Sequence, residues 1–549
     1  MNRSSRTPPV ISYDVWANIA NFLPSKALRG LYSVNQAFFN LSMDERYRHL
    51  DLSTPEDAST RIFLHRLRGD QFRIRRVRQL TLSIRGFGFF PGLDAFDWKD
   101  SLSKNGLDAA YYNPSQKQKK KPLKKKANKL TEAETSLIML QETLNVIRSI
   151  PDLQRCIIQG SFPAPGHGSS YGIAFPLVLA AWSASKNTMR SLELEVPVEV
   201  LSDILPAGLA FDGLEHFGIN LNITYRSTDA MEMLLSTMVP FISHHQSTIR
   251  SFALRTCEHL HLTPFFESLP SIPLLRDLEV EQGYVSTLQT NTTGLHDFLT
   301  KHAEQLKYLT LLFHGLGLHL VRDKLMEDWP QQPCLHVSYP SLKKLAFGLH
   351  NFPEGFGEKI QKSLDDFWTP ELRHLKLPMT LEADQVDVIF SKVPQDVELL
   401  SLSLTVESLN PGLFDTLSTR LPHLVDLDIN VASGKLTGLE ETQGHSSNDD
   451  DSDSESEEGI PIPRTSPTEI ESQRQFVADM KARNYAQWPL RHLTLSLATL
   501  RTAIPDESLA TTKSAIALAL PRLQILQFRY ESDELKDHFI NLKFNLQED

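Results

Sequence analysis

A short pattern of apolar residues recurs along most of the chain, with apolar side chains at positions 1, 4 and 6 of each copy. In most copies a polar residue lies between positions 4 and 6, and this alternation is typical of a β-strand with one buried face. The thirteen copies are Val77/Leu80/Leu82, Leu153/Cys156/Ile158, Met189/Leu192/Leu194, Leu214/Phe217/Ile219, Ile249/Phe252/Leu254, Leu275/Leu278/Val280, Leu306/Leu309/Leu311, Leu342/Leu345/Phe347, Leu372/Leu375/Leu377, Val397/Leu400/Leu402, Leu424/Leu427/Ile429, Leu490/Leu493/Leu495 and Leu523/Leu526/Phe528.

The segments between these copies carry apolar residues at helical spacing, as in the run around Met231 and Leu234 and in Leu295, Phe298 and Leu299. One strand and one helix per unit, stacked side by side, resemble a leucine-rich-repeat solenoid. The asparagine or cysteine usual in that repeat is mostly missing. We therefore expect an α/β fold in which residues 70–549 form an irregular solenoid of strand-helix units. An ordinary parallel sheet is the alternative, although thirteen strands would be unusual for one.

The residues before the repeats have a different, helical pattern. Ser12 is a suitable N-cap, and apolar residues at helical spacing follow it as far as Leu23. Pro24-Ser25 ends this helix and begins another, and a third follows, so residues 11–40 are predicted to form three short helices. So small a segment can hardly bury all its large apolar side chains internally. Some of them should face the following domain or a partner.

The order and spacing of these apolar residues resemble the F-box, as in Asp14-Val15-Trp16-x-x-Ile19-x-x-Phe22-Leu23-Pro24 followed by Leu28, Leu31, Val34-Asn35 and Phe38. In that family the motif is a three-helix hook, here residues 11–52, that docks on the Skp linker of a cullin-based ubiquitin ligase. The resemblance implies a substrate-recognition adaptor whose repeats hold a client protein. The residues it assigns to the Skp-type linker are Ile11, Val15, Trp16, Ile19, Phe22, Leu23, Pro24, Leu28, Leu31, Val34 and Phe38.

Two positions differ from the usual F-box, whose opening Leu-Pro is Ile11-Ser12 here and whose tryptophan near the motif's end is Phe38. A helical cap over the first repeat is therefore an alternative interpretation of residues 11–52. The corresponding alternative for the whole chain is a protein-interaction scaffold that does not assemble a ligase.

Charged side chains occupy many strand positions that point away from the repeat core. Both signs occur, with an acidic patch around the sixth copy and a basic zone around the eighth and ninth. Such a mixed face suits a protein or peptide client better than a phosphate backbone, although each residue taken alone fits an ordinary solvated strand equally well. The residues expected to contact a client are Glu193, Glu195, Asp277, Glu279, Glu281, Lys344, His374 and Lys376.

Composition narrows the classes of partner. The formal net charge is −11, with 41% apolar and 22% charged residues, which argues against a general nucleic-acid or anionic-membrane binder. Three distant cysteines build no disulfide framework, and no apolar run approaches a membrane span, so we expect an intracellular protein of the cytoplasm, the nucleus or both.

Three segments are expected to be disordered, namely residues 1–10, a basic insertion at 114–128 and an acidic insertion at 438–466. The basic insertion concentrates lysines from Lys117 to Lys126, which fit either a solvated loop or a nuclear import signal. The acidic insertion interleaves serines with carboxylates from Asp449 to Glu458, a pattern that acidophilic kinases accept.

The sequence contains no phosphate-binding glycine loop, nucleophile elbow or paired zinc motif. The best metal candidate is Cys257-x-His259-x-His261, but no second cluster completes a tetrahedral site. We therefore expect no enzymatic activity, no metal and no cofactor.

Overall fold

The computed structural model describes residues 12–54, 57–83, 132–160, 170–222, 230–256, 260–284, 291–315, 331–350, 357–437, 467–497 and 506–530. The chain divides into two compact units. Unit 1 comprises Met1–Glu258 and Ser268–Leu275, and unit 2 comprises His259–Glu267 and Arg276–Asp549. Ile11, Cys257, His259 and the segments 1–10, 114–128 and 438–466 lie outside the described residues.

Unit 1 begins with the three helices that the sequence predicts, α1 (Tyr13–Asn21), α2 (Ser25–Gly30) and α3 (Gln36–Tyr47). Ser12 occupies the N-cap position of α1, but its side chain makes no capping hydrogen bond. Asn35 caps α3, because its Oδ1 accepts a hydrogen bond of 2.9 Å from the Phe38 amide. The third helix continues past the predicted limit of residue 40 to Tyr47.

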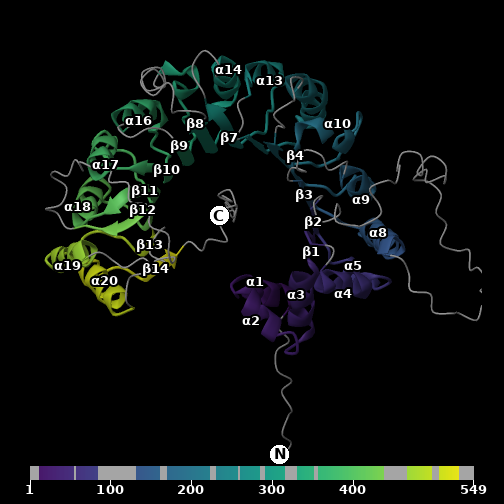
Figure 1. The fold of residues 1–549 in the computed structure, drawn as a ribbon, viewed down its shortest axis with the longest axis horizontal. Helices are drawn as coiled ribbons and strands as arrows, with labels where there is room; N and C mark the ends of the chain where they lie inside the picture. The colour runs from purple at the N-terminus through teal and green to yellow at the C-terminus, as the bar shows by residue number, and fades with distance from the viewer. Residues whose placement is uncertain are drawn as a thin grey trace, which may run out of the picture. The chain divides into compact units, whose positions relative to one another are not determined.

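The rest of unit 1 alternates strands with helices, as Figure 1 shows. Its strands are β1 (His49–Leu52), β2 (Gln79–Ser83), β3 (Arg155–Gln159), β4 (Ser191–Pro197), β5 (His216–Asn222) and β6 (Ser251–Arg255). Its helices are α4 (Ala58–Leu67), α5 (Gln71–Ile74), α8 (Glu132–Arg148), α9 (Ser170–Ser185), α10 (Leu201–Ile204), α11 (Ala230–Met233) and α12 (Val239–His245), with a 3₁₀ turn at Val198–Val200 and a π turn at Leu234–Met238.

Unit 2 repeats the same alternation. Its strands are β7 (Asp277–Tyr284), β8 (Tyr308–Gly315), β9 (Lys344–His350), β10 (His374–Leu381), β11 (Ser401–Leu409), β12 (Asp426–Leu436), β13 (His492–Leu497) and β14 (Ile525–Tyr530). Its helices are α13 (Thr263–Ser268), α14 (Thr293–His302), α16 (Gly357–Leu364), α17 (Ala383–Phe390), α18 (Pro411–Arg420), α19 (Pro467–Lys481) and α20 (Asp506–Ala519), with 3₁₀ turns at Pro333–Leu335 and Asp365–Phe367.

Within each unit the strands pair in parallel and in chain order. In unit 2 the helices α14 and α16–α18 lie on one side of the strands, and the opposite face of the sheet carries no helix in this stretch (Figure 1). Sequential parallel strands with helices on one side distinguish a solenoid from an ordinary parallel sheet. The α/β solenoid of strand-helix units predicted from the sequence is therefore confirmed.

The apolar positions of the repeat line up across the strands. Position 4 forms a buried ladder in unit 1, whose members are Leu50, Leu80, Cys156, Leu192, Phe217 and Phe252. The corresponding ladder begins in unit 2 with Leu278, Leu309 and Leu345. Every side chain of these ladders faces the helices, so the core of each unit lies between its sheet and its helix layer.

Two details of the repeat differ from the sequence-based expectation. The first is β1, which the pattern search did not predict, because its copy begins with a tyrosine: Tyr47, Leu50 and Leu52 are all buried, and β1 pairs with β2. The second concerns β11.

The copy Val397/Leu400/Leu402 is displaced by two residues. Register pairs Leu375 with Leu402 and Leu377 with Leu404, so the true copy is Leu399/Leu402/Leu404. Leu404 is 1% exposed, whereas Leu400 is 37% exposed and precedes the strand. The error arose because apolar residues alternate with a period of two from Leu400 to Leu404, and a shift by two residues leaves such a pattern unchanged.

None of the helices in the described ranges is both long and apolar enough to cross a membrane.

Candidate partner-binding surfaces

Helix α1 carries two apolar stripes on different faces. Trp16, Ala20 and Leu23 follow one another at intervals of four and three residues and pack against α2 and α3. Their partners include Leu28 and Phe38, with the rings of Trp16 and Phe38 centred 5.2 Å apart. This inward stripe builds the small core of the helical module, by which we mean α1, α2 and α3.

The second stripe of α1 faces outward. Val15, Ile19 and Phe22 have the same spacing as the inward stripe but lie one residue earlier, which rotates them by about 100° around the helix. They are 47%, 40% and 88% exposed. Tyr13, Tyr32 and Val34 of the same module are also exposed. We call Val15, Ile19 and Phe22 the outer stripe; it presents large apolar side chains to solvent.

The residues that the F-box resemblance assigned to the Skp-type linker therefore divide into two groups. Val15, Ile19, Phe22, Pro24 and Val34 are exposed and available to a partner. The others belong to the module's interior, namely Trp16, Leu23, Leu28, Leu31 and Phe38.

Sequence reasoning did not assign Tyr13 and Tyr32 to the partner surface, since neither belongs to the F-box residues that were quoted.

Helix α3 fastens the helical module to the first repeat of unit 1. The guanidinium of Arg76, in the turn after α5, forms an ion pair with Asp44 and donates a hydrogen bond of 3.1 Å to Asn40 Oδ1. Arg76 also lies over the ring of Phe72, 4.2 Å from its centroid, and Phe72 stacks on Phe39 of α3. These contacts use α3 and leave the outer stripe of α1 uncovered.

The sheet face of unit 1 holds the first two residues of the predicted client surface. Glu193 on β4 forms an ion pair of 2.5 Å with Arg155 on β3. Glu195 lies two residues further along β4, on the same face of the sheet, and also has an interaction partner. The acid at position 193 is thus neutralised within the fold.

The sheet face of unit 2 brings together the other predicted client residues. Glu281 on β7 pairs with His314 on β8, with 2.5 Å between Oε1 and Nε2. Lys344 on β9 lies over the ring of Tyr308, 5.2 Å from its centroid. Asp277 and Glu279 stand on β7 beside these residues and also have partners. This part of the face is an internal network of charges.

Two basic residues stand on β10 further along this face. His374 and Lys376 are separated by one residue and therefore project to the same side of the sheet. Burial lowers the pKa of His374, and the charge of Lys344 lowers it further, while Asp426 opposes this. Burial also lowers the pKa of Lys376, against the attraction of Asp428 and Glu279.

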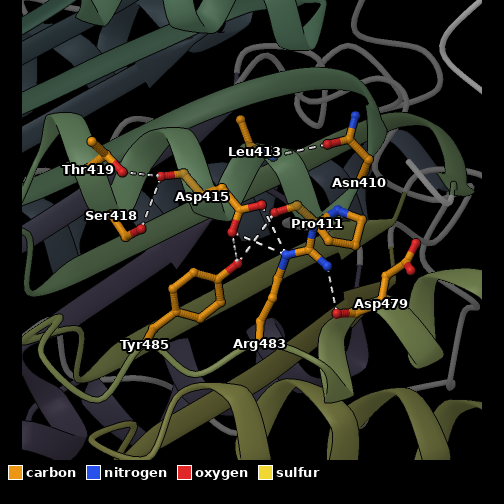
Figure 2. A network of polar contacts seen from close by, with 9 residues as sticks. All are labelled: Asn410, Pro411, Leu413, Asp415, Ser418, Thr419, Asp479, Arg483 and Tyr485. Carbon is orange, nitrogen blue, oxygen red and sulfur yellow. Dashed lines mark hydrogen bonds and ion pairs between the residues drawn. The ribbon is translucent and has the colours of Figure 1, made fainter. Parts of the chain in front are cut away.

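A second polar cluster of unit 2 has a structural role (Figure 2). The carboxylate of Asp415 on α18 accepts hydrogen bonds of 3.0 and 3.1 Å from Arg483 Nε and one of 2.6 Å from the Tyr485 hydroxyl. Arg483 Nη1 also donates to the Asp479 carbonyl at 2.6 Å. Burial raises the pKa of Tyr485, and the hydrogen bond to Asp415 and the charge of that carboxylate raise it further. These bonds fix the segment after α19 against α18.

Within the described ranges, no group of three or more His, Cys, Asp or Glu side chains could hold a metal ion. Burial raises the pKa of the Cys334 thiol to about 12 and that of Cys156 still further, so neither is a ready nucleophile. His245 is buried, and its Nε2 accepts a hydrogen bond of 2.9 Å from the Phe211 amide.

No family model matches the sequence, and no curated protein matches it either. Among solved structures, the chain is similar to one in the crystal structure of the Rad7 and Elc1 complex in yeast, with 13% identity over 67% of this chain and 75% of that chain and a TM-score of 0.35. A protein from Bacteroides fragilis matches 51% of this chain and 66% of its own, with 13% identity and a TM-score of 0.20. We draw no functional conclusion from similarities this low.

Proposed function

We propose that the chain is a substrate-recognition adaptor of a Skp/cullin/F-box-type ubiquitin ligase. The helical module binds a Skp-type linker and, through it, a cullin, while the sheet face of the solenoid holds a client protein. The chain itself performs no chemistry. Its contribution is to hold client lysines at high effective concentration near a ubiquitin-charged enzyme, in the cytoplasm, the nucleus or both.

The outer stripe of α1 is the observation that supports this proposal. The same helix already has an inward stripe that holds the module together, so stability of the module does not require Val15, Ile19 and Phe22 to be apolar. Phe22 is 88% exposed at the C-terminal end of α1. A large aromatic side chain in such a position suits an anchor that is buried when a partner binds.

The experiment is capture of a purified Skp-type linker and its cullin by the full-length chain. The test variant replaces Val15, Ile19 and Phe22 with alanine, which removes the outer stripe and leaves the module's core untouched. We expect the wild type to capture both proteins and the variant to capture neither.

A matched control carries alanine at Ile62 and Leu518, which are 53% and 69% exposed and lie outside the helical module. It should capture the linker like the wild type. Equal capture by all three proteins would exclude the outer stripe as the docking surface, and no capture by the wild type would refute the adaptor proposal.

The alternative is a protein-interaction scaffold that does not assemble a ligase. The contacts of α3 with Arg76 and Phe72 favour it, since they suit a module that caps the end of the first sheet. The two functions differ in one measurable consequence. A cap is needed for the stability of unit 1 but captures no Skp-type linker, whereas an adaptor captures the linker through a stripe that is dispensable for stability.

A further inference from the structure

Three neighbouring strands of unit 2 present ordered columns of side chains on the face away from the helices. The column on β10 is basic, with His374 and the cation Lys376, and the column on β12 is acidic, with Asp426 and Asp428. The strand between them, β11, carries serines at the two aligned positions, Ser401 and Ser403. Register therefore places Lys376, Ser403 and Asp428 in one row across the sheet, and the other three residues in a second row.

The serine side chains between the two outer columns are much shorter than those of lysine or aspartate. Ser401 and Ser403 are half-buried, so they remain accessible. Beyond Asp428 the same row continues with Thr494, which is half-buried, and then with Gln527, which is exposed. In the opposite direction the row is closed, since Ala346 and Thr310 are buried.

Lys376 and Asp428 attract each other across the serine column, but neither forms an ion pair within the described part of the chain. Both are partly desolvated: burial raises the pKa of Asp428, against the attraction of Arg529 and Lys376. Each charge thus loses hydration without gaining a close partner. A ligand with one group of each sign, lying over the serine column, would supply both partners at once.

The spacing of the columns sets the spacing of the ligand's charges. Neighbouring strands lie about 4.8 Å apart, so the columns on β10 and β12 are about 10 Å apart. A peptide in the polyproline II conformation advances about 3.1 Å per residue and completes one turn every three residues. Side chains three residues apart therefore project to the same side of the peptide, about 9 Å from each other.

We propose that this face of unit 2 binds a client segment in the polyproline II conformation that carries Asp or Glu over Lys376 and His374 and, three residues away, Lys or Arg over Asp428. The proposal deepens the adaptor function and rests on it, because it identifies the occupant as the client. It also accounts for the mixed charge of the face, since a ligand of one sign would be repelled by one of the columns.

The test is selection of random heptapeptides displayed on phage by the full-length chain. We expect enriched sequences to contain an acidic residue three positions from a basic one, in either order along the peptide. The Lys376→Gln variant should lose the preference for the acid, and Asp428→Asn the preference for the base. A matched control, Lys301→Gln, removes the same charge from α14 in the helix layer and should select the same peptides as the wild type.

The selected peptide is then synthesised, and its affinity is measured by fluorescence anisotropy. Loss of one charge-assisted contact should weaken binding to Lys376→Gln about tenfold, while Lys301→Gln binds within a factor of two or so of the wild type. Selection of no peptide, of peptides without this spacing, or of the same peptides by Lys376→Gln would overturn the proposal.

Capture of the Skp-type linker, measured on the same preparations, separates the two proposals. Peptide binding without linker capture would leave this site standing and refute the adaptor function. Linker capture without the expected peptide preference would leave the adaptor function standing and refute this site.

Discussion

Two leucines of one repeat provide a matched test of the corrected register at β11. Leu404 is 1% exposed and belongs to the buried ladder between the sheet and the helices, whereas Leu400 is 37% exposed and precedes the strand. Replacing a buried leucine with alanine costs about 2–5 kcal/mol of stability, through lost burial and the cavity that remains. For Leu400 most of the cavity cost disappears, because solvent already reaches the side chain. We therefore expect about 1 kcal/mol for Leu400→Ala.

The assay is urea unfolding of the full-length variants, followed by circular dichroism. The midpoint of Leu404→Ala should fall well below that of the wild type, and the midpoint of Leu400→Ala should stay close to it. The slope of the transition should be the same for all three proteins, since none of the changes alters the surface that unfolding exposes. Equal losses, or a greater loss for Leu400→Ala, would show that the strand is aligned as the sequence pattern first suggested.

Two further predictions concern the stability of the solenoid. Replacing Asp415 with asparagine removes the negative charge that both Arg483 and Tyr485 contact, and it should lower the free energy of unfolding in urea by about 1–3 kcal/mol. Tyr485→Phe removes one hydrogen bond and should lower it by about 1 kcal/mol. Equal effects of the two changes would mean that the ion pair contributes nothing. Burial lowers the pKa of His245 and His302, so the folded chain binds fewer protons than the unfolded chain once the pH falls below about 6.5. Thermal midpoints should therefore decrease as the pH falls from 7 to 5, and this decrease should be smaller in a variant with glutamine at both histidines; an unchanged pH dependence would contradict this explanation.

The solenoid could be predicted from the sequence because its core repeats. A strand with positions 4 and 6 facing the core leaves the same pattern in each copy, and register aligns the copies within each unit, with the displaced copy at β11 corrected. The prediction failed where the pattern was ambiguous. The first copy was missed because it begins with Tyr47 and not with an aliphatic residue. The period of two from Leu400 to Leu404 fitted more than one alignment of β11.

The two faces of the helical module were harder to separate. Trp16 and Val15 are neighbours in the sequence, and both belong to the F-box resemblance, but only packing against Leu28 and Phe38 identifies Trp16 as a core residue. Helical spacing alone gives two equally good stripes on α1. Which one faces inward depends on the positions of α2 and α3, which no pattern within α1 contains.

The columns of side chains on β10, β11 and β12 could not be predicted from the sequence alone. Lys376 and Asp428 are far apart in the chain, and insertions of variable length separate the repeats. Their alignment in one row depends on the register of three strands. The sequence also contained no sign that Glu193 and Glu281, two of the residues predicted to contact a client, pair with neighbours within the sheet.

The affinity of the full-length chain for a purified Skp-type linker, measured by titration calorimetry, tests the central claim most directly. The wild type should bind, and the variant with alanine at Val15, Ile19 and Phe22 should bind at least about a hundredfold more weakly, since a few central apolar anchors supply most of the energy of such an interface. The variant should unfold at the same urea concentration as the wild type, because the outer stripe contributes nothing to the module's core. A stable variant that binds the linker as tightly as the wild type would contradict the account.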